Sequence, residues 1–288
     1  MPRFSLIVAT LDRTEEFSLL LQSLARQEMC DFELIVVDQN TDDRLSPYIE
    51  EWLSANALHE SDSTNSISVK HLRSEAGVSR ARNLGLEHSR GEIVAFPDDD
   101  CWYQPDTLRN VHEWFEQHPD YGVFSIGCRD EQGRVSSNRL GTQACDLNRI
   151  TAFRATGACC YFVRRPSESV PFLFDESLGP GAGTPFGAGE DTDLVLTLMS
   201  HGIRARFYPL IYVGHPLRDG YVSPDRAAKY GGGWGRVLAK HSLYVLWIGL
   251  ISFDLVRAIL SGIRGDHRRA SQLLAHGRGL AQAFFAKA

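Results

Sequence analysis

Gly91-Glu-Ile-Val-Ala-Phe-Pro-Asp-Asp-Asp100 is the stretch that decides the fold. Its apolar run Ile93–Phe96 lies between Gly91 and Pro97, and this pattern predicts a short buried strand. Three carboxylates come next, where the strand would leave the sheet, which is the edge at which open α/β sheets bind ligands. Two unit charges about 4 Å apart repel by roughly 4 kcal/mol at an effective dielectric of 20. The acids therefore lie in open water, take up protons or hold a hard cation such as Mg²⁺ or Mn²⁺.

The charge of the chain is distributed unevenly. The 288 residues can form one large domain or two small ones, and their net charge is −6. Residues 226–288 hold ten Lys and Arg and two Asp and Glu, a charge of +8, so the other 225 residues carry −14. The acidic body argues against nucleic acid as a partner, whereas a basic tail is attracted to an anionic membrane surface.

The cysteines and the N-terminus both predict a cytoplasmic location. The apolar run Phe4–Thr10 is too short for a signal peptide, and Asp12 and Arg13 come directly after it. The cysteines form neither a C-x-x-C pair nor a regular framework, which predicts reduced thiols and does not favour a structural zinc site. The six cysteines are Cys30, Cys101, Cys128, Cys145, Cys159 and Cys160.

The first hundred residues alternate between strand and helix patterns. Strands are expected at Phe4–Thr10, Glu33–Asp38, Ile67–Leu72 and Ile93–Phe96, and helices after Thr14, around Arg44–Ala55 and over Gly77–His88. This alternation predicts an α/β fold with a mostly parallel central sheet and helices on both of its faces. No G-x-G-x-x-G comes after the first strand, so a nucleotide bound here would need a metal rather than a glycine loop for its phosphates.

After Pro105 the pattern is less regular. We expect a helix near Asp106–His118, strands near Gly122–Ile126, Gly157–Arg164, Arg204–Tyr208 and Leu210–Val213, and a helix that begins at Asp191 or Thr192. A glycine-rich loop, Gly179–Gly189, ends in Glu190-Asp191. From about Asp225 the chain has a helical pattern. Within it, the glycine-rich segment Tyr230–His241 predicts a loop that either closes over the active site or packs on the body.

The tail contains a basic amphipathic segment. Leu243–Phe253 is an apolar run of eleven residues, too short to span a bilayer, and Asp254 and Arg257 interrupt the sequence beyond it. Residues 240–269 therefore predict an interfacial helix. Two interpretations stay open: peripheral contact with the inner face of the cytoplasmic membrane, or packing on the body or in a homodimer. The basic neighbours of the run are Lys240, His241, Arg264, Arg268 and Arg269.

Five pieces of the chain, within residues 4–215, resemble family 2 glycosyltransferases in order and approximate spacing. They are Ser5–Thr10, Glu33–Asp38, Gly77–Asn83, Phe96–Asp100 and Gly189–Asp191. The resemblance implies a Rossmann-like GT-A domain over 1–225, with a nucleotide-sugar-binding half at 1–101 and an acceptor-binding half at 102–225, followed by the helical basic tail 226–288. It implies an inverting enzyme of bacterial surface or exported polysaccharide synthesis. The donor would be a nucleotide-diphosphate sugar, and the acceptor would be a glycan or a lipid-linked acceptor.

The resemblance also implies roles for single residues. Asp100 and Asp98 match the family's Asp-x-Asp and would bind Mn²⁺ or Mg²⁺, with His215 as a further ligand. Asp191 would be the general base, and Glu190 would help to hold the acceptor. Asp38 would accept a pyrimidine N–H, which favours UDP- or dTDP-sugars. The other implied nucleotide-sugar contacts are Thr10, Asp12, Arg13, Arg82, Asn83, Asp98 and Asp99.

Several alternatives stay open at this point. Asp191 also suits an N-cap, Asp38 a strand-end turn, and His215 a structural role. A sugar-phosphate nucleotidylyltransferase has a similar sheet and metal, but it normally carries a glycine- and Arg/Lys-rich loop that Thr10–Arg13 does not provide. A non-catalytic binding module on the same fold is a third possibility, and the intact Asp100 and Asp191 argue against it.

Overall fold

The computed structural model describes residues 1–56, 67–136, 141–157, 159–217 and 220–285. Within these residues the chain divides into two compact units. The first unit comprises Met1–Ala76, Arg80–Leu173 and Val195–Leu217. The second comprises Gly77–Ser79, Phe174–Leu194 and Arg218–Ala288, as far as these are described. The predicted boundary at residue 225 stays a prediction.

The first unit is built on a sheet. Its strands are β1 (Phe4–Thr10), β2 (Phe32–Asp38), β3 (Ile67–Arg73), β4 (Ile93–Ala95), β5 (Trp102–Tyr103), β6 (Tyr121–Arg129), β7 (Cys145–Asp146), β8 (Tyr161–Arg164) and β9 (Arg204–Gly214). The described residues form nine strands in the order β3-β2-β1-β4-β8-β6-β9-β5, and β7 pairs with β9 outside this path. Strands β3, β2, β1 and β4 are parallel, as are β6 and β9, while β8 runs antiparallel between β4 and β6. The predicted α/β class is confirmed.

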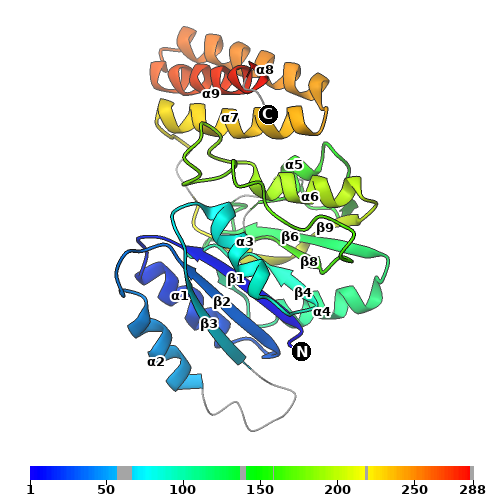
Figure 1. Ribbon diagram of the computed structural model, residues 1–288. Coiled ribbons are helices and arrows are strands. Elements are labelled where there is room, and N and C mark those ends of the chain that lie inside the picture. Colours follow the sequence, from blue (N-terminus) through cyan, green and yellow to red (C-terminus); the bar gives the residue numbers. More distant parts are fainter. Residues whose placement is uncertain (57–66, 137–140, 158, 218–219, 286–288) are drawn as a thin grey trace. The chain divides into compact units, whose positions relative to one another are not determined.

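Helices cover both faces of the sheet (Figure 1). Helices α1 (Glu15–Leu24), α2 (Ser46–Asn56) and α4 (Thr107–Gln117) place Phe17, Trp52 and Leu108 in one core with the even-numbered residues of β1. Helix α3 (Val78–His88) lies on the other face, where Gly85 contacts Ile7 so closely that a Cβ would overlap its side chain. Alternate residues of a strand point to opposite faces, so the unbroken apolar run of β1 serves both layers.

The second half of the sheet differs from expectation in three places. The strands expected at Arg204–Tyr208 and Leu210–Val213 are one strand, β9, with an irregular register around Pro209. Proline has no N–H for the ladder and is tolerated at such a bulge. The strand expected from Gly157 begins only at Tyr161, because Cys159 has a left-handed backbone with φ 64°. Three short elements, β5, β7 and α5 (Ala152–Ala155), show no sequence periodicity and were not expected.

The tail of the second unit is helical, as predicted, and Figure 1 shows its three helices side by side. They are α7 (Pro224–Lys240), α8 (Tyr244–Ile263) and α9 (His267–Phe285), and α9 packs against both α7 and α8. Ser223 caps α7 by accepting a hydrogen bond from the backbone N–H of Arg226, and Pro224 occupies the first turn.

The prediction of a loop at Tyr230–His241 is wrong, because Tyr230–Lys240 belongs to helix α7. Its glycines bring two helix backbones into contact. A Cβ on Gly231 of α7 would overlap the carbonyl oxygen of His276 in α9, and a Cβ on Gly279 of α9 would overlap that of Ala228 in α7. This close approach compensates for the low helix propensity of glycine.

Helix α8 is longer than the apolar run that the sequence shows. Asp254 lies inside the helix, and its carboxylate is 2.5 Å from Nδ1 of His276 in α9. Among the described residues, α8 is the one helix long and apolar enough to cross a membrane by length and composition, and only 17 % of its apolar window is buried. The prediction that this segment is too short to span therefore needs correction, although these two properties do not show that it does span.

The close contact between α7 and α9 at their glycines leads to a prediction about stability. Gly279→Ala should lower the free energy of unfolding by about 1–3 kcal/mol, because the methyl group pushes α9 away from α7. A Cβ added to Gly249 of α8 would meet no atom within 4 Å, so Gly249→Ala should raise it by about 0.5–1 kcal/mol. Urea unfolding of both variants measures the two effects, and changes of the same sign would contradict the packing argument.

Candidate active site

Several predicted site residues of the first unit meet at the carboxyl edge of the sheet. Thr10 at the end of β1 is the register partner of Asp38 at the end of β2. Ala9 of β1 forms a bridge with Asp98, which lies just after β4. His215 comes directly after β9. Parallel strands present their carboxyl ends at one edge, so the topology collects these side chains.

Asp98, Asp100 and His215 form a cluster that suits a divalent cation. One ligand atom from each lies within 4.8 Å of the other two. Nε2 of His215 is 3.3 Å from Oδ1 of Asp100 and 3.9 Å from Oδ2 of Asp98. Nδ1 of His215 lies 2.8 Å from the carbonyl oxygen of Pro216, and because that oxygen only accepts, Nδ1 carries the proton. Nε2 therefore faces the carboxylates, the arrangement of a metal-binding histidine.

Two arginines form ion pairs with the three carboxylates. Arg13 NH1 lies 2.7 Å from Oδ1 of Asp99 and 2.6 Å from Oδ2 of Asp100. Arg82 NH2 lies 3.1 Å from Oδ1 of Asp98, and the Arg82 side chain is only 2 % exposed. The Arg13 side chain is 32 % exposed, so it can reorient towards a ligand, whereas Arg82 is held in place.

The pKa values of the cluster reflect burial and charge together. Burial by itself would lower the pKa of His215, but the hydrogen bond to Asp100 and the charges of Asp100 and Asp98 raise it above its ordinary value. Burial raises the pKa of Asp99, and the positive charge of Arg13 opposes this only in part. A cation bound at Nε2 would replace the proton of His215, so its positive charge would take over the role of the imidazolium.

Asp38 is fully buried and has more partners than the sequence indicated. Its Oδ1 accepts hydrogen bonds of 2.8 Å from both the backbone N and the Nδ2 of Asn40. Its Oδ2 lies 3.0 Å from Nε2 of His71 and 2.9 Å from NH1 of Arg73. Asp38 is therefore fixed on one side by Asn40 and on the other by β3, through the register that pairs it with Arg73. Its role as a base-reading residue stays a prediction.

Two other implied donor contacts also occupy constrained positions. Asp12 has a left-handed backbone with φ 62°, and its N–H donates to Oδ1 of Asn40 at 2.8 Å. Asn83 is buried on α3, next to Arg82 in the chain. Contact of Asp12 and Asn83 with a nucleotide stays a prediction.

Glu190 and Asp191 belong to the second unit, at the start of helix α6 (Glu190–Ser200). Both are buried, and the helix begins directly after Gly189, which has φ 95°. Asp191 therefore lies in the first turn, one residue past the helix start, and is not its N-cap. In the same turn, Asp193 lies 2.7 Å from Nζ of Lys240 and 2.9 Å from Nε2 of His241. This ion pair, which the sequence analysis missed, fixes the start of α6 to the end of α7.

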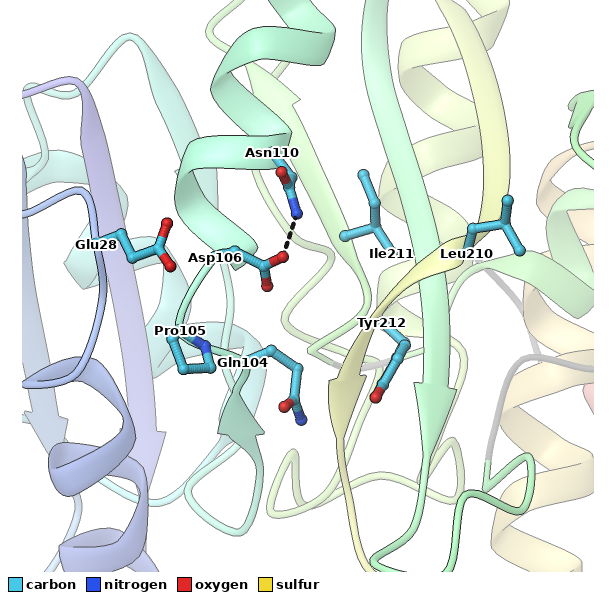
Figure 2. Close-up of a pocket in the computed structure, with 8 residues that line it drawn as sticks. All are labelled: Glu28, Gln104, Pro105, Asp106, Asn110, Leu210, Ile211 and Tyr212. Atoms are coloured by element: carbon cyan, nitrogen blue, oxygen red, sulfur yellow. Dashed lines mark hydrogen bonds between the residues drawn. The ribbon is translucent and has the colours of Figure 1, made fainter.

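Each unit also contains a pocket outside these clusters. Figure 2 shows a pocket of about 350 Å³ in the first unit, where Asn110 donates to Asp106 at 2.9 Å. None of the predicted site residues lines it, so we assign it no role. A pocket of about 700 Å³ in the second unit is lined by the loop from Gly179 to Gly187 and by Arg226, Lys229 and Tyr230 of α7. Glu190 and Asp191 come after this loop in the chain.

Relatives of known name match the chain over part of their length. Poly(ribitol-phosphate) beta-N-acetylglucosaminyltransferase TarS of Staphylococcus aureus (strain Mu50) is 31 % identical over 137 residues, which cover 46 % of this chain and 22 % of TarS. Putative glycosyltransferase EpsH of Bacillus subtilis is 32 % identical over 110 residues, which cover 38 % of this chain and 29 % of EpsH. The matched region is therefore less than a third of either relative.

Solved structures share the fold. The crystal structure of TarS residues 1–349 of S. aureus with UDP-GlcNAc aligns with TM-score 0.59 and 19 % identity, over 94 % of this chain and 90 % of that chain. The mannosyltransferase PcManGT of Pyrobaculum calidifontis, in complex with GDP-Man and Mn²⁺, aligns with TM-score 0.59 and 16 % identity, over 100 % of this chain and 76 % of that chain. At these identities the likeness concerns the fold alone.

The family assignment rests on a longer match. Residues 5–165 match the family described as Glycosyl transferase family 2, and this region holds the parallel strands β2, β3 and β4, the three consecutive acids and Arg82. The match spans more than half of the chain. The chain therefore belongs to glycosyl transferase family 2.

Proposed function

We propose that the protein is an inverting, metal-dependent transferase that moves a sugar from a nucleotide-diphosphate sugar to an acceptor hydroxyl, in the assembly of a surface or exported polysaccharide. The observation that carries the proposal is the cluster of Asp98, Asp100 and His215 at the carboxyl edge of the sheet, in a family 2 chain. The names of the relatives support a polysaccharide acceptor, because TarS is a poly(ribitol-phosphate) N-acetylglucosaminyltransferase.

The first unit would bind the donor. Asp98, Asp100 and Nε2 of His215 would hold Mn²⁺ or Mg²⁺, which when bound neutralises negative charge on the diphosphate leaving group. Arg13, partly exposed beside Asp100, can donate charge-assisted hydrogen bonds to a diphosphate oxygen. Asp38 would accept the ring N–H of a pyrimidine base, which favours UDP- or dTDP-sugars. The TarS structure with UDP-GlcNAc supports a uridine donor.

The second unit would supply the base. Asp191 accepts the proton of the acceptor hydroxyl while the acceptor oxygen forms a bond to the anomeric carbon. The bond from that carbon to the diphosphate oxygen breaks on the opposite face, so the configuration inverts. Glu190 helps to hold the acceptor. The pocket lined by Arg226 and Lys229 supports an acceptor with negative charge, because both cations are in the unit that contains Asp191.

Asp100→Asn should weaken donor binding only when the metal is present. Calorimetric titration of UDP, dTDP and GDP with Mn²⁺ should give tight binding of one nucleotide, and excess chelator should abolish it. The variant should bind that nucleotide at least about 10-fold more weakly with Mn²⁺, because a charged ligand of the ion is lost. Asp120→Asn, at an exposed aspartate with an 80 % exposed side chain, is the matched control and should bind as wild type. If neither the chelator nor the Asp100→Asn substitution changes the nucleotide affinity, the metal site is refuted.

Asp191→Asn should separate donor binding from chemistry. The amide cannot take the acceptor proton, so turnover should fall about 10²-fold or more while the nucleotide affinity stays unchanged. Asp225→Asn, which also removes an acid from the first turn of a helix in the same unit, should keep wild-type turnover. Single-turnover measurement of sugar transfer, together with titration of the nucleotide, gives both values. Undiminished transfer by Asp191→Asn would remove its role as base.

We further propose that α8 contacts an anionic membrane surface, which would place the enzyme at the inner face of the cytoplasmic membrane. Its outward side exposes large apolar side chains, among them Val245 at 88 %, Ile248 at 66 % and Ile263 at 77 %. Basic residues lie within this helix or close to its C-terminal end in the sequence: Arg257, Arg264, Arg268 and Arg269. Apolar area combined with positive charge is the composition of helices that bind anionic lipid surfaces.

The membrane proposal predicts that the double variant Ile248→Glu and Ile263→Glu binds vesicles of phosphatidylglycerol and phosphatidylcholine at least about 10-fold more weakly. Burying two isoleucines contributes more than the roughly 1.4 kcal/mol that a tenfold change requires. Leu19→Glu, at an exposed leucine of α1, is the control and should leave co-sedimentation unchanged. If the wild-type protein does not bind the vesicles and is a dimer, while the double variant is a monomer, α8 is a dimer interface instead.

A further inference from the structure

Four cysteines meet in the core of the first unit, and the proposed transfer reaction uses none of them. Cys101 comes directly after Asp100, Cys128 lies on β6, and Cys159 and Cys160 precede β8. Each is at most 1 % exposed. They come from three separate segments of the chain, so the sheet topology, not local spacing, brings them together.

Three of the thiols are close enough to share one ion, and the fourth lies beside one of them. The Sγ atoms of Cys128, Cys159 and Cys160 lie within 4.8 Å of one another. The Sγ atoms of Cys159 and Cys160 are 3.7 Å apart, and the thiol of Cys101 is within hydrogen-bonding reach of Cys159. In a tetrahedral zinc site with Zn–S bonds of about 2.3 Å, two sulfur ligands lie about 3.8 Å apart. The sulfur atoms of Cys128, Cys159 and Cys160 are thus already near the spacing of such a site, and Cys101 is next to them as the fourth ligand.

The backbone at Cys159 supplies a second, independent observation. Neighbouring residues of an extended strand point to opposite faces, so Cys159 and Cys160 could not both reach one ion in that conformation. Cys159 instead has φ 64°, a left-handed conformation that non-glycine residues rarely adopt. Hydrogen bonds to Phe96 and Ile126 fix the backbone on both sides, at 3.3 Å and 2.8 Å. A strained turn that brings adjacent thiols together suits a ligand better than simple packing.

We propose that Cys101, Cys128, Cys159 and Cys160 form a thiolate site that holds Zn²⁺. Each thiol loses its proton to solvent as its sulfur forms a bond to the ion. Soft thiolates select zinc, whereas the carboxylates of Asp98 and Asp100 select a hard ion such as Mg²⁺ or Mn²⁺, so the two sites sort different metals. Four protein ligands leave no open position, so the zinc is structural.

The zinc would position the donor site. Cys101 is covalently next to Asp100, and Cys128 is the register partner of Val213 on β9, two residues before His215. One ion would therefore fix both the segment that carries Asp100 and strand β6. Strand β6 is paired with β9, and β9 leads to His215. The ion would also tie that segment and β6 to the start of β8.

The metal content of the intact protein tests the proposal. The chain is produced in zinc-supplemented medium, purified with a thiol reductant and EDTA, and analysed by elemental mass spectrometry. Wild type should retain one zinc per chain, and Cys160→Ser should lose it. Cys30→Ser and Cys145→Ser change the two cysteines outside the cluster and should keep the zinc. These two variants are matched controls for loss of a thiol.

Cobalt substitution gives a readout that depends on the ligands. Co²⁺-loaded wild type should show thiolate-to-cobalt charge transfer in the near ultraviolet and the intense visible bands of a tetrahedral ion. Asp100→Asn should keep both signals, which separates the thiolate site from the donor cluster. Negligible zinc in wild type, together with a cobalt spectrum lacking charge transfer, would overturn the proposal and leave the thiols as core packing. Because this outcome is measured on wild type alone, it stands even if Cys160→Ser fails to fold.

Discussion

Three adjacent carboxylates at the end of one buried strand are the constraint on which the proposed donor site depends. Like charges in partly buried surroundings repel by several kcal/mol, so they need compensation from nearby cations. Arg13 contacts two of them from the loop after β1, Arg82 reaches Asp98 from α3, and His215 approaches from the end of β9. These groups are up to about two hundred residues apart in sequence, so the charges balance only once the sheet has formed.

The parallel half of the sheet could be predicted because its causes are local. Strands β1 and β2 are apolar runs that end in polar residues, and their observed bounds agree with the expected ones to within one residue. The carboxyl-edge placement of Asp98 and Asp100 is a consequence of the same pattern. The second half of the sheet was harder to predict from the sequence. Strand β8 runs antiparallel between β4 and β6, and strand order is a property of long-range pairing that periodicity does not contain.

The features that sequence reasoning missed are long-range contacts. Glycine is a poor helix former, so Gly231 and its neighbours indicate a loop when they are considered locally, but contact between two helix backbones reverses that balance. In the sequence Asp38 is simply the last residue of a strand. Its partners on β3 come next to it only because β2 pairs with β3 in a particular register. The convergence of Cys128 with Cys159 is likewise invisible as spacing, since the familiar metal motifs are short and local.

The two proposed ion sites would meet different demands in one enzyme. A donor metal must bind with the nucleotide sugar and allow the nucleotide product to leave, so its ligands should be few and mainly hard oxygen donors, as the carboxylates of Asp98 and Asp100 beside His215 are. The strand ends that present those ligands must stay in place through every exchange. Closed thiolate coordination beside Asp100 would provide that rigidity, because a fully coordinated structural ion adds its binding free energy to the folded state. Ligand chemistry would thus keep an exchangeable ion and a permanent one apart, although Asp100 and Cys101 are adjacent residues.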